Sequence, residues 1–150
     1  MTTTIKAIAL ILDEENINYM FNREKNFLFL AIALENIKEQ GITIEMLENG
    51  NILQFSAPLL FQLSDRVHKG LVMQEILELQ FKTPLLKFTC STVNTNKQYI
   101  EARIDFPLYD DPLRSEDLFS CLNFMGAKLT EQLPRLQHIL DFGCEPLQNR

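Results

Sequence analysis

Several residue types that enzymes commonly use are scarce in this chain. Its 150 residues include no tryptophan, five glycines, three cysteines and two histidines. The glycines are isolated from one another, so no glycine-rich loop can cradle a phosphate. The short motifs of nucleotide-binding proteins, serine hydrolases and zinc proteases do not occur either. These absences exclude the usual nucleotide sites, and we expect no cofactor, no catalytic residue and no enzymatic activity.

The three cysteines are dispersed and show no paired spacing. An odd, sparse set is typical of a reducing compartment, and we expect no structural disulfide. Cys90 alternates with Phe88 in a strand-like pattern, and Cys121 flanks a helical core stripe. We interpret both as small buried hydrophobic residues, whereas Cys144 near the end of the chain is expected to be exposed.

His68 and His138, the only histidines, lie far apart in the sequence. Zinc requires three or four nitrogen, sulfur or carboxylate ligands at bonding distance. With so few candidate ligands we expect no metal site, and we place both histidines on the solvent side of helices.

Acidic residues outnumber basic ones, 20 against 14, which gives a formal net charge of −6. A protein that binds nucleic acid needs a basic face to displace counterions, and the lysines and arginines here are scattered. We therefore expect neither nucleic acid nor an anionic membrane surface as a partner. The charge suits solubility or a basic protein partner.

Long hydrophobic runs are also missing. The longest, 27–34, is far shorter than the roughly 20 residues that span a bilayer. The first residues lack the basic and apolar pattern of a signal peptide. Together with the dispersed cysteines, this pattern predicts a cytoplasmic protein outside the membrane.

The length suits one domain, and no repeat, low-complexity tract or linker divides the chain. We expect a single domain over residues 1–150, with 143–150 as a loose tail. The threonines at positions 2–4 can cap a first helix that runs to about Glu15. Polar and apolar residues then alternate over 17–22, which predicts a half-buried strand, and the doubly apolar segment 26–33 predicts a central strand.

The clearest local signal is the pair Asn49-Gly50. These residues are preferred at the centre of a type I′ turn because both positions need φ > 0. The turn fixes a hairpin over 42–57 in which Met46 faces Leu53, and in this register apolar residues face apolar and polar face polar.

The middle of the chain predicts one helix and a second hairpin. Pro58 is expected to close the preceding strand, since proline cannot donate to a sheet ladder. A helix over about 64–80 follows and stops before Pro84. Alternating apolar residues over 86–106, with a turn at 94–97, predict the second hairpin.

The last third predicts a long helix with Ser115 as its N-cap and two acids, Glu116 and Asp117, near the positive end of the helix dipole. Its core stripe consists of Leu118, Leu122, Met125, Leu129 and Leu133. Pro134 is expected to kink this helix or to start a new one. The order helix, four strands, helix, two strands, helix predicts an α+β domain, with helices packed on an antiparallel sheet.

The helix over 64–80 is apolar over an arc of about 200°, which is wider than one sheet face needs. One interpretation is that neighbouring loops cover the excess with Phe61, Leu63 and Leu85. The other is a subunit or partner interface. The candidate interface residues are Val72, Met73, Ile76, Leu77 and Phe81.

The densest acidic cluster comprises Asp105, Asp110, Asp111, Glu116 and Asp117. Paired carboxylates can perform acid–base chemistry or bind a divalent cation, but the alternating pattern of a calcium loop is missing. A solvated loop with helix-capping acids is the favoured interpretation. The alternative is a small-molecule-responsive regulator or enzyme that uses the acidic loop near Asp110.

Five segments, 47–50, 52–58, 72–77, 104–113 and 132–137, carry a resemblance to a known family. Together with the element order, they resemble the type III secretion chaperone-like fold. Within that fold, the chain is similar to the YbjN-type sensory-regulator group and its cyanobacterial relatives of unknown function.

This resemblance implies a homodimer that binds protein segments without ATP, or a regulator that acts through protein contacts. It supplies no catalytic residues. In chaperones of this fold, the helix between the two groups of strands often forms the dimer contact, and here that helix is 64–80. We therefore expect a non-catalytic protein-binding or regulatory module.

Overall fold

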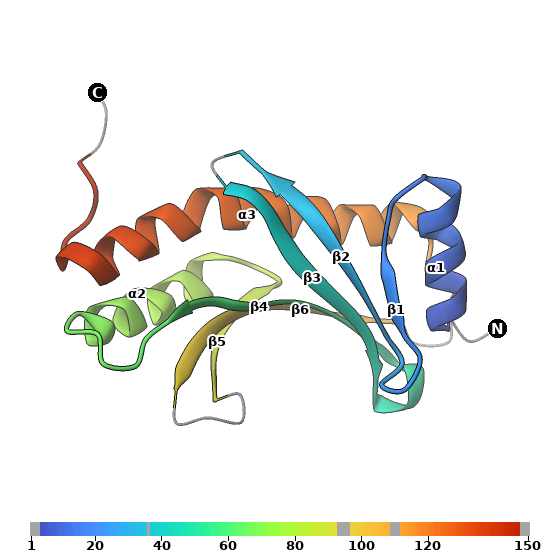
Figure 1. The fold of residues 1–150 in the computed structure, drawn as a ribbon, viewed down its shortest axis with the longest axis horizontal. Helices are drawn as coiled ribbons and strands as arrows, with labels where there is room; N and C mark the ends of the chain where they lie inside the picture. The colour runs from blue at the N-terminus through green and yellow to red at the C-terminus, as the bar shows by residue number, and fades with distance from the viewer. Residues whose placement is uncertain (1–3, 36, 93–96, 109–111, 148–150) are drawn as a thin grey trace.

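The computed structural model describes residues 4–35, 37–92, 97–108 and 112–147. Six strands form one antiparallel sheet in the order β1-β2-β3-β4-β6-β5, which confirms the predicted α+β fold (Figure 1). The elements follow the predicted sequence of helix, four strands, helix, two strands and helix. They are α1 (Ile5–Glu14), β1 (Met20–Asn22), β2 (Phe27–Leu34), β3 (Ile37–Leu47), β4 (Ile52–Gln62), α2 (Lys69–Lys82), β5 (Leu86–Thr92), β6 (Gln98–Pro107) and α3 (Ser115–Phe142).

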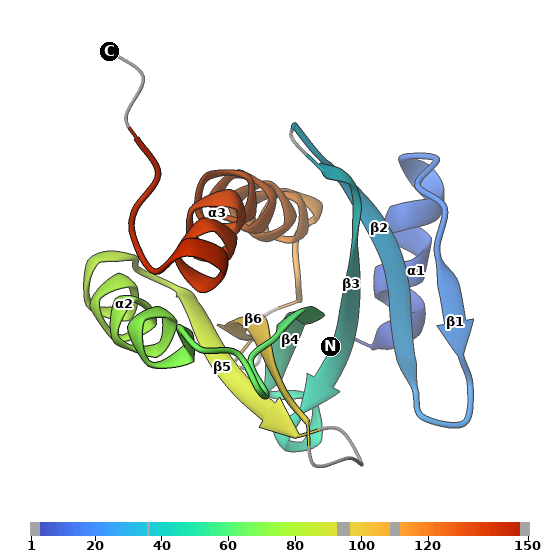
Figure 2. The same cartoon turned by 60° about the vertical axis from the view of Figure 1, so that its left-hand side comes forward.

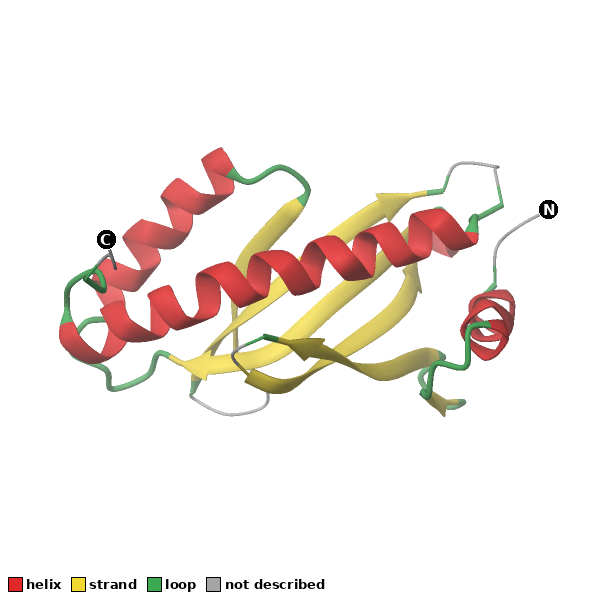
Figure 3. Ribbon diagram, turned by 90° about the horizontal axis from the view of Figure 1, so that it is seen from above, coloured by secondary structure: helices red, strands yellow, loops and turns green. Residues whose placement is uncertain are grey.

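The longest helix, α3, crosses one face of the sheet and organises the core. Seen from above, α2 lies beside the C-terminal half of α3, and α1 lies at the opposite end of the molecule (Figure 3). The predicted core stripe of α3 is confirmed, because all five of its residues are buried: Leu118, Leu122, Met125, Leu129 and Leu133. No helix within the described ranges is both long and apolar enough to cross a bilayer.

The first helix and the first strand occur as predicted, but the strand is shorter than predicted. Thr4 caps α1, and its hydroxyl oxygen accepts a hydrogen bond from the backbone N–H of Ala7 at 3.1 Å. The alternating segment was expected to be strand from residue 17, but β1 begins only at Met20. The reason is that the N–H of Ile17 donates to the carbonyl of Leu12 at 2.9 Å, which keeps the chain next to α1.

The first hairpin is confirmed in register and in turn chemistry. Met46 lies opposite Leu53, as predicted. At the turn, Asn49 and Gly50 have φ of 57° and 90°, and the N–H of Asn51 donates to the carbonyl of Glu48 at 3.2 Å. Positive φ at both central residues is what a type I′ turn requires.

The prediction that Pro58 ends the strand is wrong. β4 continues through Pro58 to Gln62 and pairs with β6 along most of its length. The pairing with β6 shifts register between Ala57 and Phe61. A proline is tolerated in a strand at such an irregularity, because no ladder hydrogen bond is required from its nitrogen there.

The middle helix α2 begins at Lys69, later than predicted, and ends before Pro84, as predicted. The residues that precede it form turns, and Ser64 does not cap the helix. Its hydroxyl oxygen instead accepts a hydrogen bond from the N–H of Gln98 at 2.5 Å, which joins this loop to the start of β6.

The predicted N-cap of α3 needs correction, and one of the two alternatives for Pro134 is removed. Arg114, and not Ser115, occupies the N-cap position, and Ser115 is the first helical residue. The helix continues through Pro134 to Phe142, so no new helix starts there. Gly143 ends it with φ of 73°, a left-handed conformation that glycine adopts without strain.

Away from the core, β4, β5 and β6 carry polar side chains that bond across the strands. The side-chain amide of Gln54 donates to Asp105 at 2.8 Å, and the Lys87 ammonium lies 3.2 Å from the same carboxylate. Burial alone would raise the pKa of Asp105, but the hydrogen bonds from Gln54 and Lys87 outweigh it and lower this pKa. These bonds reinforce the same strand register that the apolar face requires.

Candidate functional site

Helix α2 divides its apolar residues between the core and the surface. Val72 and Ile76 are buried, together with Leu79, against the rest of the domain. Both had been candidates for an interface, and their burial within one chain removes them from it. Periodicity predicts the width of an apolar arc but not which part of it faces the sheet.

The three remaining candidates are exposed and lie along one side of α2. Met73, Leu77 and Phe81 are 42%, 68% and 94% exposed. Because they are four residues apart, they follow one another on successive turns of the same helix face. We call these three residues the α2 stripe.

Within the described part of the chain, neighbouring loops leave the α2 stripe exposed. Of the residues predicted to cover it, Phe61 and Leu63 are themselves buried in the core, and Leu85 is 48% exposed. A contiguous exposed apolar surface on a helix is a common mark of a protein contact.

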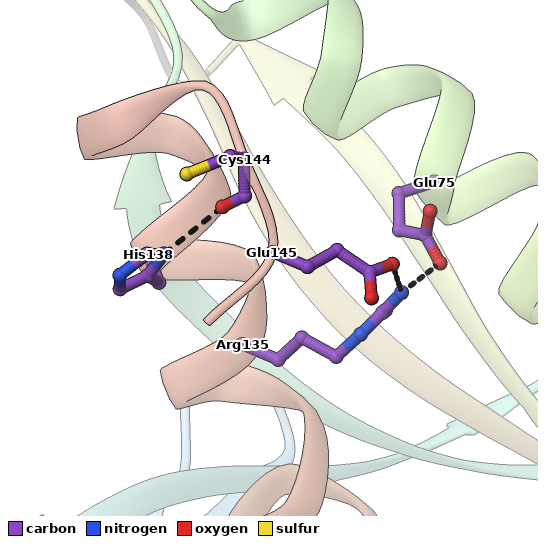
Figure 4. Close-up of polar contacts among 5 residues, drawn as sticks. All are labelled: Glu75, Arg135, His138, Cys144 and Glu145. Carbon is purple, nitrogen blue, oxygen red and sulfur yellow. Dashed lines mark hydrogen bonds and ion pairs between the residues drawn. The ribbon is translucent and has the colours of Figure 1, made fainter. Parts of the chain in front are cut away.

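Helix α2 is fixed to α3 on its other side. The guanidinium of Arg135 lies 2.5 Å from the carboxylate of Glu75 and 2.5 Å from that of Glu145 (Figure 4). Burial alone would lower the pKa of Arg135, but hydrogen bonds to Glu75 and Glu145 raise it. Views from two directions place α2 and α3 side by side (Figure 2). The α2 stripe is therefore presented on an anchored helix.

The cysteines are placed as predicted in two of three cases. Cys121 is buried and Cys144 is exposed, but Cys90 is exposed, which corrects the expectation that it is buried. Cys90 lies on β5, an edge strand, and nearer its end than the buried Phe88. Burial, and to a lesser extent the charge of Asp117, raises the pKa of Cys121 to about 11.

We expect iodoacetamide at pH 8 to modify two of the three thiols rapidly. Cys90 and Cys144 are accessible, whereas Cys121 is buried and its raised pKa leaves almost no reactive thiolate. Mass spectrometry of the intact protein would show two added groups in native buffer and a third only after denaturation. Rapid modification of all three thiols would contradict the placement of Cys121.

Both histidines are half-buried near the C-terminal end of α3, although we had placed them in solvent. The ring of His68 packs against Gly143, where an added Cβ would lie 2.7 Å from its Cε1 atom. The Nδ1 atom of His138 lies 2.9 Å from the carbonyl oxygen of Cys144 (Figure 4). Among the residues that the structure describes, no three histidines, cysteines or acids are grouped as metal ligands.

The acidic cluster is not assembled into a site within the described ranges. Asp105 bonds across the sheet, and Asp117 lies 3.3 Å from the Arg114 guanidinium in the first turn of α3. Asp110 and Asp111 lie outside the described residues. Asp105 and Asp117 are therefore occupied by structural contacts, and Glu116 is exposed in the first turn of α3.

A groove that sequence reasoning missed lies between α3 and β2. Its volume is about 930 Å³, and four consecutive residues of β2, Leu30 to Ala33, line one side. Small residues of α3, Gly126 and Ala127, line the other. The sequence signals this groove only by the small residues on these two elements. That signal could not be used, because no local pattern predicts that β2 and α3 are neighbours.

Comparisons with known proteins find a likeness of fold to a solved structure. No protein-family model and no curated protein matches the chain. The crystal structure of YbjN from E. coli, described as a candidate transcription regulator, superimposes with a TM-score of 0.59 at 12% sequence identity. The match covers 92% of each chain. At this identity it is a likeness of fold alone, and the chain therefore has a YbjN-like fold.

Proposed function

We propose that the chain is a non-catalytic protein-binding module that acts as a homodimer through the α2 stripe. The observation that carries the proposal is the exposure of Met73, Leu77 and Phe81 on a helix that is held to the rest of the domain by its buried residues and by the Glu75–Arg135 ion pair. An exposed apolar stripe on an anchored helix lowers the solubility of a protein unless another surface covers it.

A second copy of the same chain is the occupant that the stripe fits. Met73 and Phe81 lie four residues on either side of Leu77. A two-fold axis at Leu77, with two α2 helices antiparallel, brings Leu77 against its own copy and each Met73 against a Phe81. Closed two-fold pairing is the commonest form of oligomer, and a thioether packs favourably against an aromatic ring.

The fold comparison supports a regulatory setting for this dimer. YbjN is described as a candidate transcription regulator. With a net charge of −6, this chain suits regulation through protein contacts better than direct binding to a nucleic acid. Pairing through this helix is also what the resemblance to secretion chaperones implies.

We expect Leu77→Glu to convert a dimer into a folded monomer. The substitution would bury two like charges at the two-fold axis, whereas in the monomer the side chain is exposed and its charge is solvated. Multi-angle light scattering at micromolar concentration would give about twice the chain mass for the wild type and one chain mass for the variant. Circular dichroism would show that both remain folded.

Leu10→Glu is the matched control. Leu10 is 62% exposed on α1, close to the 68% of Leu77, and it lies outside the α2 stripe. The same chemical change there should leave the dimer intact. A monomeric wild type, or equal loss of the dimer in both variants, would overturn the proposed homodimer.

A further inference from the structure

The groove between α3 and β2 borders the backbone edge of a strand. Side chains of successive strand residues point to opposite faces of a sheet. A groove over one face would therefore be lined by alternate residues, yet Leu30, Ala31, Ile32 and Ala33 all line this one. The groove consequently runs along the edge of β2, where backbone N–H and C=O groups are presented.

That edge of β2 is only partly paired. β1 pairs only with Phe27 to Phe29 of β2. It begins at Met20, because the chain before Met20 turns toward α1. In the described part of the sheet, the segment from Leu30 to Leu34 therefore has β3 on one side and no strand on the other. An unpaired strand edge is a template for an added strand.

The α3 side of the groove approaches β2 closely at one glycine. Gly126 faces β2, and a Cβ there would be in van der Waals contact, at 3.5 Å, with the Cδ1 atom of Ile32. Ala127, one residue further, is exposed. Pro134 also lines the groove and has no N–H, so the carbonyl of Thr130, another lining residue, lacks its usual helical donor.

The dimensions match a short extended peptide. The lining of α3 extends from Phe119 to Pro134, which is about 22 Å of helix at 1.5 Å per residue. An extended chain of about six or seven residues covers that length.

The charged residues that line the groove are acidic. Glu35 and Glu131 line it, and no lysine or arginine is among its described lining residues. Lys128, one turn before Glu131 on α3, lies 3.5 Å from the Glu131 carboxylate, so two acids stand against one base there. Glu35 directly follows the end of β2, and the side chain of Glu131 is 60% exposed. A basic side chain of an occupant would be attracted to this end of the groove.

We propose that this groove binds an extended segment of a partner protein as an additional strand antiparallel to β2. Its alternate side chains are apolar and face α3, and a lysine or arginine at its amino-terminal end lies near Glu35 and Glu131. This inference rests on the proposed protein-binding function and names the form in which a partner is recognised. It does not depend on the α2 stripe, which lies on a different helix.

A fluorescein-labelled peptide of sequence Arg-Val-Thr-Val-Thr-Val tests the proposal by fluorescence anisotropy. We expect saturable binding to the wild type and to Leu77→Glu. Replacing the arginine of the peptide by glutamate should weaken binding at least tenfold. In Glu131→Arg the preference between the two peptides should reverse, since two cations, the new guanidinium and Lys128, would then stand against Glu35 alone.

Two further variants separate the groove from the rest of the surface. Gly126→Leu would fill the groove and should weaken binding at least tenfold, with Ala127→Phe as a second blocking variant at an exposed position. Glu78→Lys changes an exposed charge on α2, outside the groove, and should leave the affinity within about twofold.

Absence of saturable binding up to 1 mM peptide, or binding that neither blocking variant weakens, would overturn the groove proposal. Peptide binding that is retained while the wild type proves monomeric would leave the groove standing and remove the homodimer. A dimer that binds no peptide would leave the homodimer standing and overturn the groove proposal.

Discussion

Replacing Phe55 by alanine should lower the free energy of unfolding by about 3–5 kcal/mol. Phe55 is fully buried in β4, between Ile44 of β3 and Ile104 of β6. Its removal leaves a cavity at the centre of the sheet that rigid neighbouring strands cannot close. Because small domains are stable by only about 5–15 kcal/mol, the loss should be visible as a large shift of the urea midpoint.

Phe142→Ala is the control for this measurement. The same side chain is removed from a position that is 66% exposed, where the ring packs against the ring of His138. We expect a loss below about 1 kcal/mol. Comparable losses for the two variants would show that β4 is not at the centre of the core.

Replacing Gly50 by valine should cost about 2 kcal/mol. Gly50 has φ of 90°, and a left-handed conformation costs an ordinary residue about 1–2 kcal/mol and a β-branched residue more. The hairpin register depends on this turn, so strain there acts on the whole β3–β4 pair. Equilibrium denaturation with urea measures the loss.

Gly50→Asn provides the comparison, because asparagine tolerates positive φ better than other residues with a side chain. Its loss should be clearly smaller than that of Gly50→Val. If the two variants were equally stable, the backbone at this turn would not be the source of the effect.

The features that the sequence predicted correctly are those determined within a few residues. Asn49 and Gly50 specify their turn by their own backbone preferences, and the alternation on either side specifies the register. The core stripe of α3 was predictable because one long helix repeats the same spacing many times. Both signals are local and redundant.

The errors arise where a distant residue decides the outcome. The helix was predicted to begin near residue 64, but the Ser64 hydroxyl accepts a hydrogen bond from Gln98 at the start of another strand, and α2 begins only at Lys69. Pro58 would end an isolated strand, but the irregular pairing between β4 and β6 accommodates it. Tertiary contacts of this kind leave no trace in a window of neighbouring residues.

The candidate interface was predictable in part for the same reason. The width of the apolar arc on α2 can be counted from the sequence, whereas its direction depends on where α3 and β5 pack. Only the packed structure assigns Val72 and Ile76 to the core and leaves Met73, Leu77 and Phe81 exposed. The groove was not predictable, since it requires β1 to begin only at Met20 and so to leave part of β2 unpaired beside a helix from the far end of the chain.

The order of the strands also has a kinetic consequence. β4 and β6 are neighbours in the sheet, yet α2 and β5 separate them in the sequence. The hairpins β3–β4 and β5–β6 can form from local contacts, but joining them requires closure of the long loop between, whose entropy is lost before the pairing compensates for it. High contact order of this kind slows folding relative to a domain built from local contacts, so we expect the pairing of β4 with β6 to limit the folding rate.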